Sequence, residues 1–153
     1  MKALRITVCA LLALCGGGAY GAEVTVSDAW VRATAPGQKV AGAYLKITSA
    51  TKAYLVGANS QAAQAVEVHE MSMTNNVMKM RPVARLELPA GKTVELKPGG
   101  YHLMLIDVAR PLAPGASVTI RLTVEGSDGR RHDTDIKADV RDLGAKGALH
   151  GKM

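Results

Sequence analysis

The sequence predicts an all-β fold, a β-sandwich or barrel with Greek-key connections, and three observations support this prediction. Short runs that are rich in β-branched residues, or that alternate between apolar and polar residues, recur beyond residue 22. Turn-forming segments with Gly, Pro, Asn or Ser separate these runs about every 8 to 12 residues. Long segments with helical periodicity are hard to place. This rhythm is typical of all-β sandwiches and barrels.

Ten strands are predicted, each bounded by such turns. In chain order they cover residues 23–26, 30–32, 42–47, 53–56, 65–71, 77–83, 93–96, 101–108, 117–124 and 131–140. Segments such as "TNN", "LPAG", "KPGG" and "GSDGR" supply the turn geometry between them. An alternative stays open for residues 59–68, "NSQAAQAVEV", where a short helical turn could precede the strand.

The first residues are typical of a secretory signal peptide. Lys2 and Arg5 are followed by an apolar run over residues 6–14 and by small residues up to Gly21. We therefore assign residues 1–21 to a signal peptide that is cleaved near Gly21/Ala22, and expect export to the periplasm. Because a membrane-spanning helix needs about 20 apolar residues, this run predicts no membrane span.

Cleavage at that point would remove both cysteines, Cys9 and Cys15. In an alternative route the protein is a lipoprotein with its lipid on Cys15, which the bulky Leu14 before it disfavours. Residues 22–140 are then one cysteine-free domain, long enough to be stabilised by its core alone. Residues 141–153 lose the alternation and gain glycine, so a flexible C-terminal tail is predicted.

Charge and aromatic content argue against nucleic acid as a partner. The formal net charge is +6, and subtracting Lys2 and Arg5 leaves +4, a mild basic excess. Beyond residue 21 the aromatic residues are Trp30 and three tyrosines, which are too few for a surface on which bases stack.

Soft metal ligands gather in the predicted strands. The segment "VEVHEMSMTNNVMKMRP", residues 66–82, contains one histidine and four methionines: His69, Met71, Met73, Met78 and Met80. Because side chains on a strand alternate between two faces, His69 and Met71 share one face. His102 and Met104 repeat this spacing in a later strand. Two strands thus each present a His-x-Met pair.

A hairpin would bring Met80, a third soft ligand, close to His69 and Met71. If Asn75 and Asn76 form a two-residue loop, cross-strand partners have numbers that sum to 151, and Met71 lies directly opposite Met80. His69 is then diagonal to Met80. A loop one residue longer or shorter would move Met80 to the other face, so this geometry depends on the turn.

Neutral thioether ligands favour Cu(I) over zinc, calcium or magnesium, and imidazole binds copper in either oxidation state. Methionine also stays available outside the cytoplasm, where thiols tend to form disulfides. A blue-copper electron carrier needs a cysteine ligand, which the predicted domain lacks. The ligand set therefore predicts that the protein holds and hands over Cu(I).

Packing is the alternative explanation, because methionine is a common gap-filler in cores. We assign Met73 and Met78 to packing or to a hydrophobic rim around the metal. His132 is predicted to be a solvated surface histidine. His150 and Met153 in the tail could add a second, looser copper-binding arm.

The full spacing resembles the H(M)-x10-M-x21-H-x-M signature of the periplasmic copper chaperone family called PCu(A)C. His69, Met80, His102 and Met104 fit it without a gap, with Met71 beside the first histidine. The segments "DAWVRATAPG", "AGAYLKI", "MKMRPV" and "LPAGKTVELKPGGYHLML" are similar to the same family. The resemblance covers about residues 27–124.

This resemblance implies a cupredoxin-like Greek-key fold and a Cu(I) site formed by His69, Met80, His102 and Met104, with Met71 as an alternate or supporting ligand. It also implies delivery of Cu(I) to the binuclear copper site of cytochrome c oxidase, alongside Sco-type thiol proteins. Some relatives bind Cu(II) through His- and Met-rich tails, and only His150 and Met153 represent such a tail here.

We therefore expect a copper-transfer protein, monomeric and not an enzyme, since no catalytic spacing stands out in the sequence. One alternative is a periplasmic copper storage or tolerance buffer without a dedicated receiver. Another is a metal-free β-sandwich that serves as an assembly module.

Overall fold

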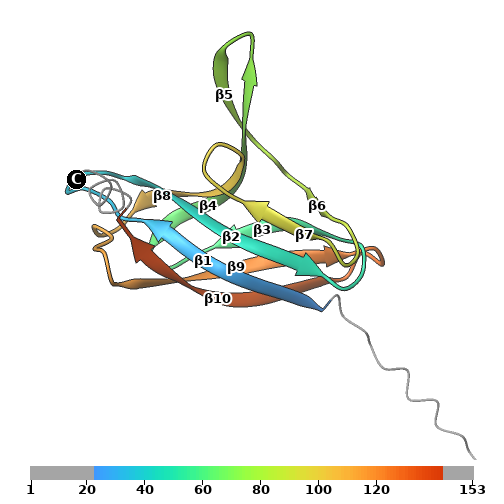
Figure 1. Ribbon diagram of the computed structural model, residues 1–153. Helices are drawn as coiled ribbons and strands as arrows, with labels where there is room; N and C mark the ends of the chain where they lie inside the picture. Colours follow the sequence, from blue (N-terminus) through green and yellow to red (C-terminus); the bar gives the residue numbers. More distant parts are fainter. Residues whose placement is uncertain (1–22, 143–153) are drawn as a thin grey trace, which may run out of the picture.

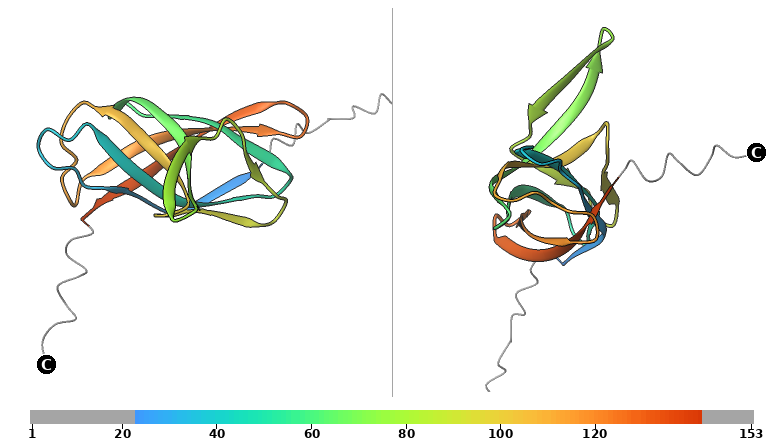
Figure 2. Two further views of the ribbon diagram at one scale, coloured as in Figure 1. Left: turned by 90° about the horizontal axis from the view of Figure 1, so that it is seen from above. Right: turned by 90° about the vertical axis from the view of Figure 1, so that its left-hand side faces the viewer.

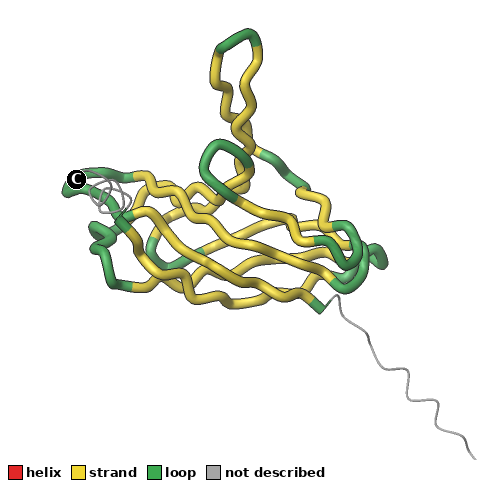
Figure 3. Tube along the Cα trace, in the orientation of Figure 1, coloured by secondary structure: helices red, strands yellow, loops and turns green. Residues whose placement is uncertain are grey.

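The computed structural model describes residues 23–142, which form ten strands and no helix (Figures 1 and 3). The strands are β1 (Val24–Arg32), β2 (Val40–Ser49), β3 (Ala53–Asn59), β4 (Ala63–Thr74), β5 (Val77–Pro82), β6 (Leu86–Leu88), β7 (Thr93–Leu96), β8 (Tyr101–Val108), β9 (Ser117–Gly126) and β10 (Arg131–Arg141). The predicted signal peptide, with Cys9 and Cys15, and the predicted tail from residue 143 onward, with His150 and Met153, lie outside the described residues. In the described part, no helix is long and apolar enough to cross a membrane.

Seven strands close into a barrel. They follow the order β4, β8, β2, β1, β10, β9 and β3, and β3 pairs back to β4 through Ala58 and Val66. The pairing of β1 with β10 is parallel, and the pairings along the rest of the ring are antiparallel. Because β8 lies between β4 and β2, the chain makes Greek-key crossovers, as predicted.

Two strand predictions were wrong in detail. The predicted strands 23–26 and 30–32 are one strand, β1, whose register shifts between Ser27 and Trp30, and Asp28 there has a φ of 50°. A bulge of this kind accommodates an irregular residue without ending the strand. In the segment 59–68, where a short helical turn was an alternative, no helix forms, and a single turn closed by Ala63 N–H and the Ser60 carbonyl at 3.4 Å precedes β4.

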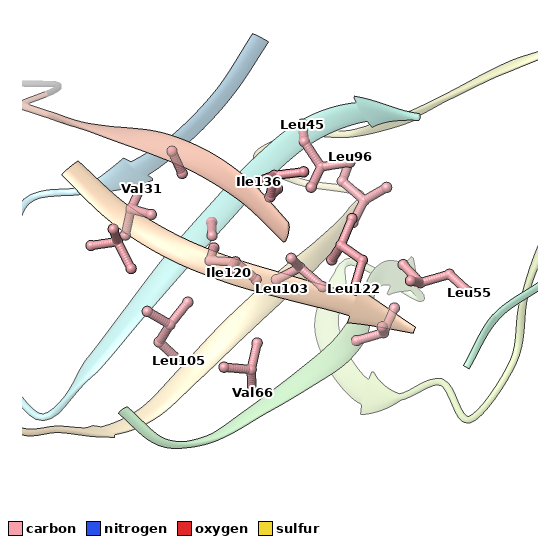
Figure 4. Close-up of a cluster of buried hydrophobic side chains, with 14 of the residues drawn as sticks. Val31, Leu45, Leu55, Val66, Leu96, Leu103, Leu105, Ile120, Leu122 and Ile136 are labelled. Atoms are coloured by element: carbon pink, nitrogen blue, oxygen red, sulfur yellow. The ribbon is translucent and has the colours of Figure 1, made fainter. Parts of the chain in front are cut away.

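The barrel interior is filled by aliphatic side chains (Figure 4). On β8, Leu103 and Leu105 are fully buried, and on β9 Leu122 is fully buried between exposed or half-buried neighbours. All of the buried hydrophobic residues in the described part of the chain are Val, Ala, Leu or Ile, so no methionine belongs to this core. The prediction that the methionines could fill the core is therefore wrong for the five described ones.

The second half of β4 and all of β5 form a hairpin that projects from the barrel (Figures 1 and 2). β5 is the edge strand of the sheet, and each of its six residues is exposed. The first half of β4 lies in the barrel wall beside β8. The fold thus places the predicted soft ligands where the projecting hairpin joins the wall.

Candidate metal centre

The predicted ligands share the outer face of the sheet. Val68 and Leu103 are core residues, and side chains alternate, so their neighbours His69 and His102 lie on the opposite face. His69 is paired directly with His102 across β4 and β8, and their ring centroids are 5.9 Å apart. Two residues further along β8, Met104 lies on the same face. The structure therefore brings both His-x-Met pairs together.

The hairpin has the register that the two-residue loop predicts. Asn75 and Asn76 have φ values of 51° and 61°, both in the left-handed region, as in a type I′ turn. Met71 is paired with Met80, and Met73 with Met78. Because Met71 is two residues from His69, the thioethers of Met71 and Met80 continue the face that carries the histidines.

Replacing Asn75 and Asn76 together by alanine is expected to weaken the hairpin by about 1 kcal/mol or more, because alanine is strained in the left-handed region. Amide hydrogen exchange in β5 should then be faster than in the unmodified protein. The matched control is Asn76→Gly, which creates the Asn-Gly sequence preferred in type I′ turns and should keep or increase the protection. Unchanged protection in the double alanine variant would contradict the role assigned to this turn.

Each histidine has one nitrogen held by the protein and one left for a metal. The Nδ1–H of His102 donates to the backbone carbonyl of Gly100 at 3.1 Å, because a carbonyl oxygen only accepts. The Nε2–H of His69 donates to the carboxylate of Glu67 at 2.8 Å for the same reason. The second nitrogen of His102, Nε2, and that of His69, Nδ1, then carry the lone pairs that can bind a metal ion.

The Nδ1 atom of His69 is buried and has no hydrogen-bond partner. A buried polar atom without a partner is unfavourable unless some other group satisfies it. A soft cation bound beside it would do so, and a carboxylate behind a metal-binding histidine is the usual device that fixes its tautomer. The donor set of two neutral imidazoles and neutral thioethers fits Cu(I). Sequence reasoning did not assign Glu67, although its spacing of two residues from His69 placed it on the same face.

Burial decreases from the barrel wall towards the hairpin. His102 is only 4% exposed, and the side chain of His69 is 12% exposed. Met71 and Met104 are half-buried, whereas Met80 is 48% exposed. A metal ion held by this set would be fixed by the histidines on one side and reached from solvent on the side of Met80.

Aromatic rings support His102 on the side away from His69. The ring of Tyr44 lies 6.4 Å from that of His102, and the ring of Trp30 lies 4.4 Å from that of Tyr44. Gly42 is paired with Met104, and a Cβ at this glycine would lie 2.6 Å from the Tyr44 hydroxyl. Burial raises the pKa of the Tyr44 phenol, although the nearby Arg32 partly opposes this, so the phenol stays neutral at physiological pH.

The third histidine of the described residues is not part of this site. His132 lies on β10, paired with Val124 of β9, and neither strand pairs with β4, β5 or β8. Copper binding by His150 and Met153 remains a prediction, because both residues lie outside the described ones. A surface pocket lined by residues that include Ser60, Arg110 and Asp135 also lies elsewhere, since none of its lining residues is a proposed ligand. Within residues 23–142, no group of three or more His, Cys, Asp or Glu side chains could hold a metal ion.

Comparison with known families supports a common origin for most of the chain. Residues 24–136 match the family described as "Putative lipoprotein LpqE-like". The protein "Putative lipoprotein Lxx21020" of Leifsonia xyli subsp. xyli is 37% identical over 107 residues. The match covers 69% of this chain but 63% of that protein, so this chain spans less than two thirds of the relative's length.

Solved structures with the same fold include PCuAC domains. The "Apo PCuAC domain from PmoF1" superposes with a TM-score of 0.63 at 24% identity, over 80% of this chain and 98% of that one. The "Solution structure of CuI-DR1885 from Deinococcus Radiodurans" has a TM-score of 0.54 at 32% identity, over 82% of this chain and 83% of that one. The predicted cupredoxin-like Greek-key fold is thereby confirmed.

Proposed function

Since the chain belongs to the LpqE-like family and has the fold of PCuAC domains, we propose that it is an exported copper chaperone. In this proposal His69, Met80, His102 and Met104 bind Cu(I), and Met71 is a supporting ligand. The copper is cargo, and the protein acts as a carrier and not as an enzyme. One of the similar solved structures, at 32% identity, is that of "CuI-DR1885", which supports Cu(I) as the metal.

The observation that carries this proposal is the direct pairing of His69 with His102, each with one nitrogen held by the protein and one free. The protein thus provides two oriented lone pairs on one face of the sheet. Thioethers from three strands, β4, β5 and β8, lie on the same face. This donor set matches a soft monovalent cation better than a hard divalent one.

The arrangement of the proposed ligands also favours the release of Cu(I). All of the proposed ligands are neutral, and Met80 lies half in solvent on an exposed edge strand. A receiver's thiolate can therefore approach from that side and form a bond to Cu(I) as the bond from Met80 breaks. Copper stays Cu(I) throughout, so the transfer needs neither an oxidant nor unfolding of the barrel.

For the receiver we propose the binuclear copper site of cytochrome c oxidase, with Sco-type thiol proteins acting alongside, as the sequence resemblance implies. We further propose that the protein is a monomer in the periplasm. The family description and the relative's name both contain the word lipoprotein, which supports export.

Because the family and the relative are both described as putative lipoproteins, the similarity also favours the alternative route in which Cys15 is lipidated. The mass of the protein isolated from the exporting cell distinguishes the two routes. Lipidation retains the chain from Cys15 onward with its acyl groups, whereas cleavage near Gly21/Ala22 leaves an unmodified chain that begins at Ala22.

The proposal is tested by an anaerobic titration of Cu(I) against a chromophoric chelator. The unmodified protein should bind Cu(I) tightly, and Met80→Leu and Met104→Leu, which keep the apolar bulk but remove the sulfur, should bind it more weakly. His132→Ala is the matched control and should behave like the unmodified protein. Absence of tight binding would leave the metal-free assembly module as the better explanation, whereas equally tight binding by all four proteins would show that Met80 and Met104 are not ligands.

A second measurement separates a chaperone from a storage buffer. The copper-loaded protein is mixed with the soluble copper-site domain of the oxidase, either directly or across a dialysis membrane. A chaperone transfers Cu(I) through contact, so the membrane should slow delivery greatly. Equal rates in the two arrangements would favour a buffer that simply releases copper into solution.

A further inference from the structure

Two methionines outside the proposed site lie on the same face of the hairpin as its ligands Met71 and Met80. Met73 and Met78 are directly opposite one another on β4 and β5, one step beyond the pair of Met71 and Met80. Successive residues on one face of a strand are about 7 Å apart, and directly opposed side chains have Cβ atoms about 5 Å apart. The hairpin therefore presents two adjacent rungs of paired thioethers that lead from its tip to the histidines.

Packing does not explain the outer rung. Met73 is 65% exposed and Met78 is 51% exposed, so neither fills the core, and Met73 has the largest exposed fraction among the exposed large hydrophobic residues of the described chain. The predicted hydrophobic rim accounts for their place near the site but not for two sulfur atoms at directly opposed positions. Aliphatic side chains would form such a rim equally well.

The opposite face of the same hairpin has a different chemistry. Glu70 and Arg81 are paired there, with an Arg81 Nη2 to Glu70 Oε2 distance of 2.8 Å, and Ser72 faces Lys79 on the next rung. That face carries charged and polar groups, whereas the face towards the histidines carries four thioethers and no charge. Only one side of the hairpin can attract a soft cation.

We propose that Met73 and Met78 form an outer Cu(I) site, through which copper enters and leaves the inner site. The inference rests on the proposed copper-binding function. A bis-thioether site at the hairpin tip binds Cu(I) more weakly than the inner site, because it has fewer ligands and no imidazole. Cu(I) then moves inward as bonds to Met71 and Met80 form while those to Met73 and Met78 break, with no change in oxidation state.

The experiment uses the full protein with ¹³C-labelled methionine methyl groups, titrated anaerobically with Cu(I) and followed by NMR. The first equivalent should shift the methyl signals of Met80 and Met104, and the second those of Met73 and Met78. In the double variant Met73→Leu, Met78→Leu, the second equivalent should be lost while the first keeps its affinity. Loading from a Cu(I)–chelator complex should become about tenfold slower in this variant, within the range by which association rates change among mutants.

The matched control is the double variant Ser72→Ala, Lys79→Ala, which alters the other face of the same hairpin and should retain both equivalents and the loading rate. The outer site is refuted if the leucine variant still takes up two equivalents. The proposal that copper reaches the inner site through the outer site is refuted if the leucine variant takes up Cu(I) as fast as the unmodified protein. Failure of the proposed function gives a different result, since the unmodified protein would then not bind even the first equivalent.

Discussion

Replacing His102 by alanine is expected to weaken Cu(I) binding by on the order of 100-fold or more, since loss even of a residue that only supports a metal ligand costs about 10- to 100-fold. His102 is the most buried of the proposed ligands, at 4% exposed. Its ring is fixed on one side by the hydrogen bond to the carbonyl of Gly100 and faces His69 on the other. Apart from His69, which is already a proposed ligand, no imidazole of the described residues lies on this face to replace it.

The affinity is measured by the anaerobic Cu(I) titration against a chromophoric chelator, and a thermal unfolding curve is recorded for the same variant. The curve is needed because His102 is buried, and its removal could also affect the fold. The unfolding transition should remain cooperative while the affinity falls. His132→Ala, a histidine on the far strand β10, should leave the affinity unchanged. A His102→Ala protein that is folded and binds Cu(I) with the original affinity would show that the site has been placed wrongly.

At Leu103, the residue next to His102, replacement by alanine is expected to lower the stability of the fold and not the affinity for copper. Leu103→Ala is expected to lower the free energy of unfolding by about 2 to 5 kcal/mol, because it removes a fully buried side chain and leaves a cavity. Small domains have a total stability of only about 5 to 15 kcal/mol. Urea unfolding of the metal-free protein measures the change. Val40→Ala on β2, 39% exposed, is the matched control and should change stability by less than about 1 kcal/mol.

In the absence of denaturant, the fraction of Leu103→Ala that remains folded should still bind Cu(I), because the side chain of Leu103 points into the barrel and the ligands point out. The variants His102→Ala and Leu103→Ala thus distinguish the role of the outer face of β8 from that of its inner face. One change removes metal binding from an intact fold, and the other weakens the fold around an intact site. If Leu103→Ala were as stable as the unmodified protein, the description of the barrel interior would be wrong.

Local pattern was enough to predict most strands and the hairpin register. The boundaries of β7 and β8 follow from alternation between clear turns, and the register of β4 with β5 follows from a two-residue loop, since the loop length fixes it. The short strand β6 was missed, because the three residues of Leu86–Leu88 are too few to show a period. The bulge at Asp28 was read as a break, because a local irregularity looks the same in sequence as a turn.

The centre of the site could be predicted only in part. His69 and His102 belong to strands separated by a long stretch of chain, and no turn between them sets their register. Their direct pairing is determined by the closed barrel, where each strand's register depends on its neighbours. The same limit applies to burial: the sequence does not distinguish a methionine in the core from one on a projecting hairpin. It therefore left packing and a hydrophobic rim as alternatives for Met73 and Met78, and their exposure excludes only packing in the core.

The division between an aliphatic core and a methionine-bearing hairpin determines how the protein would respond to oxidative damage. Peroxide converts methionine to its sulfoxide, which is polar and no longer offers a thioether sulfur. Within residues 23–142, the solvent-exposed methionines are Met73, Met78 and Met80, whereas the barrel interior contains no methionine. Oxidants would therefore disable copper handling while the barrel remained folded. Reductase repair of the sulfoxides would restore the carrier without refolding it.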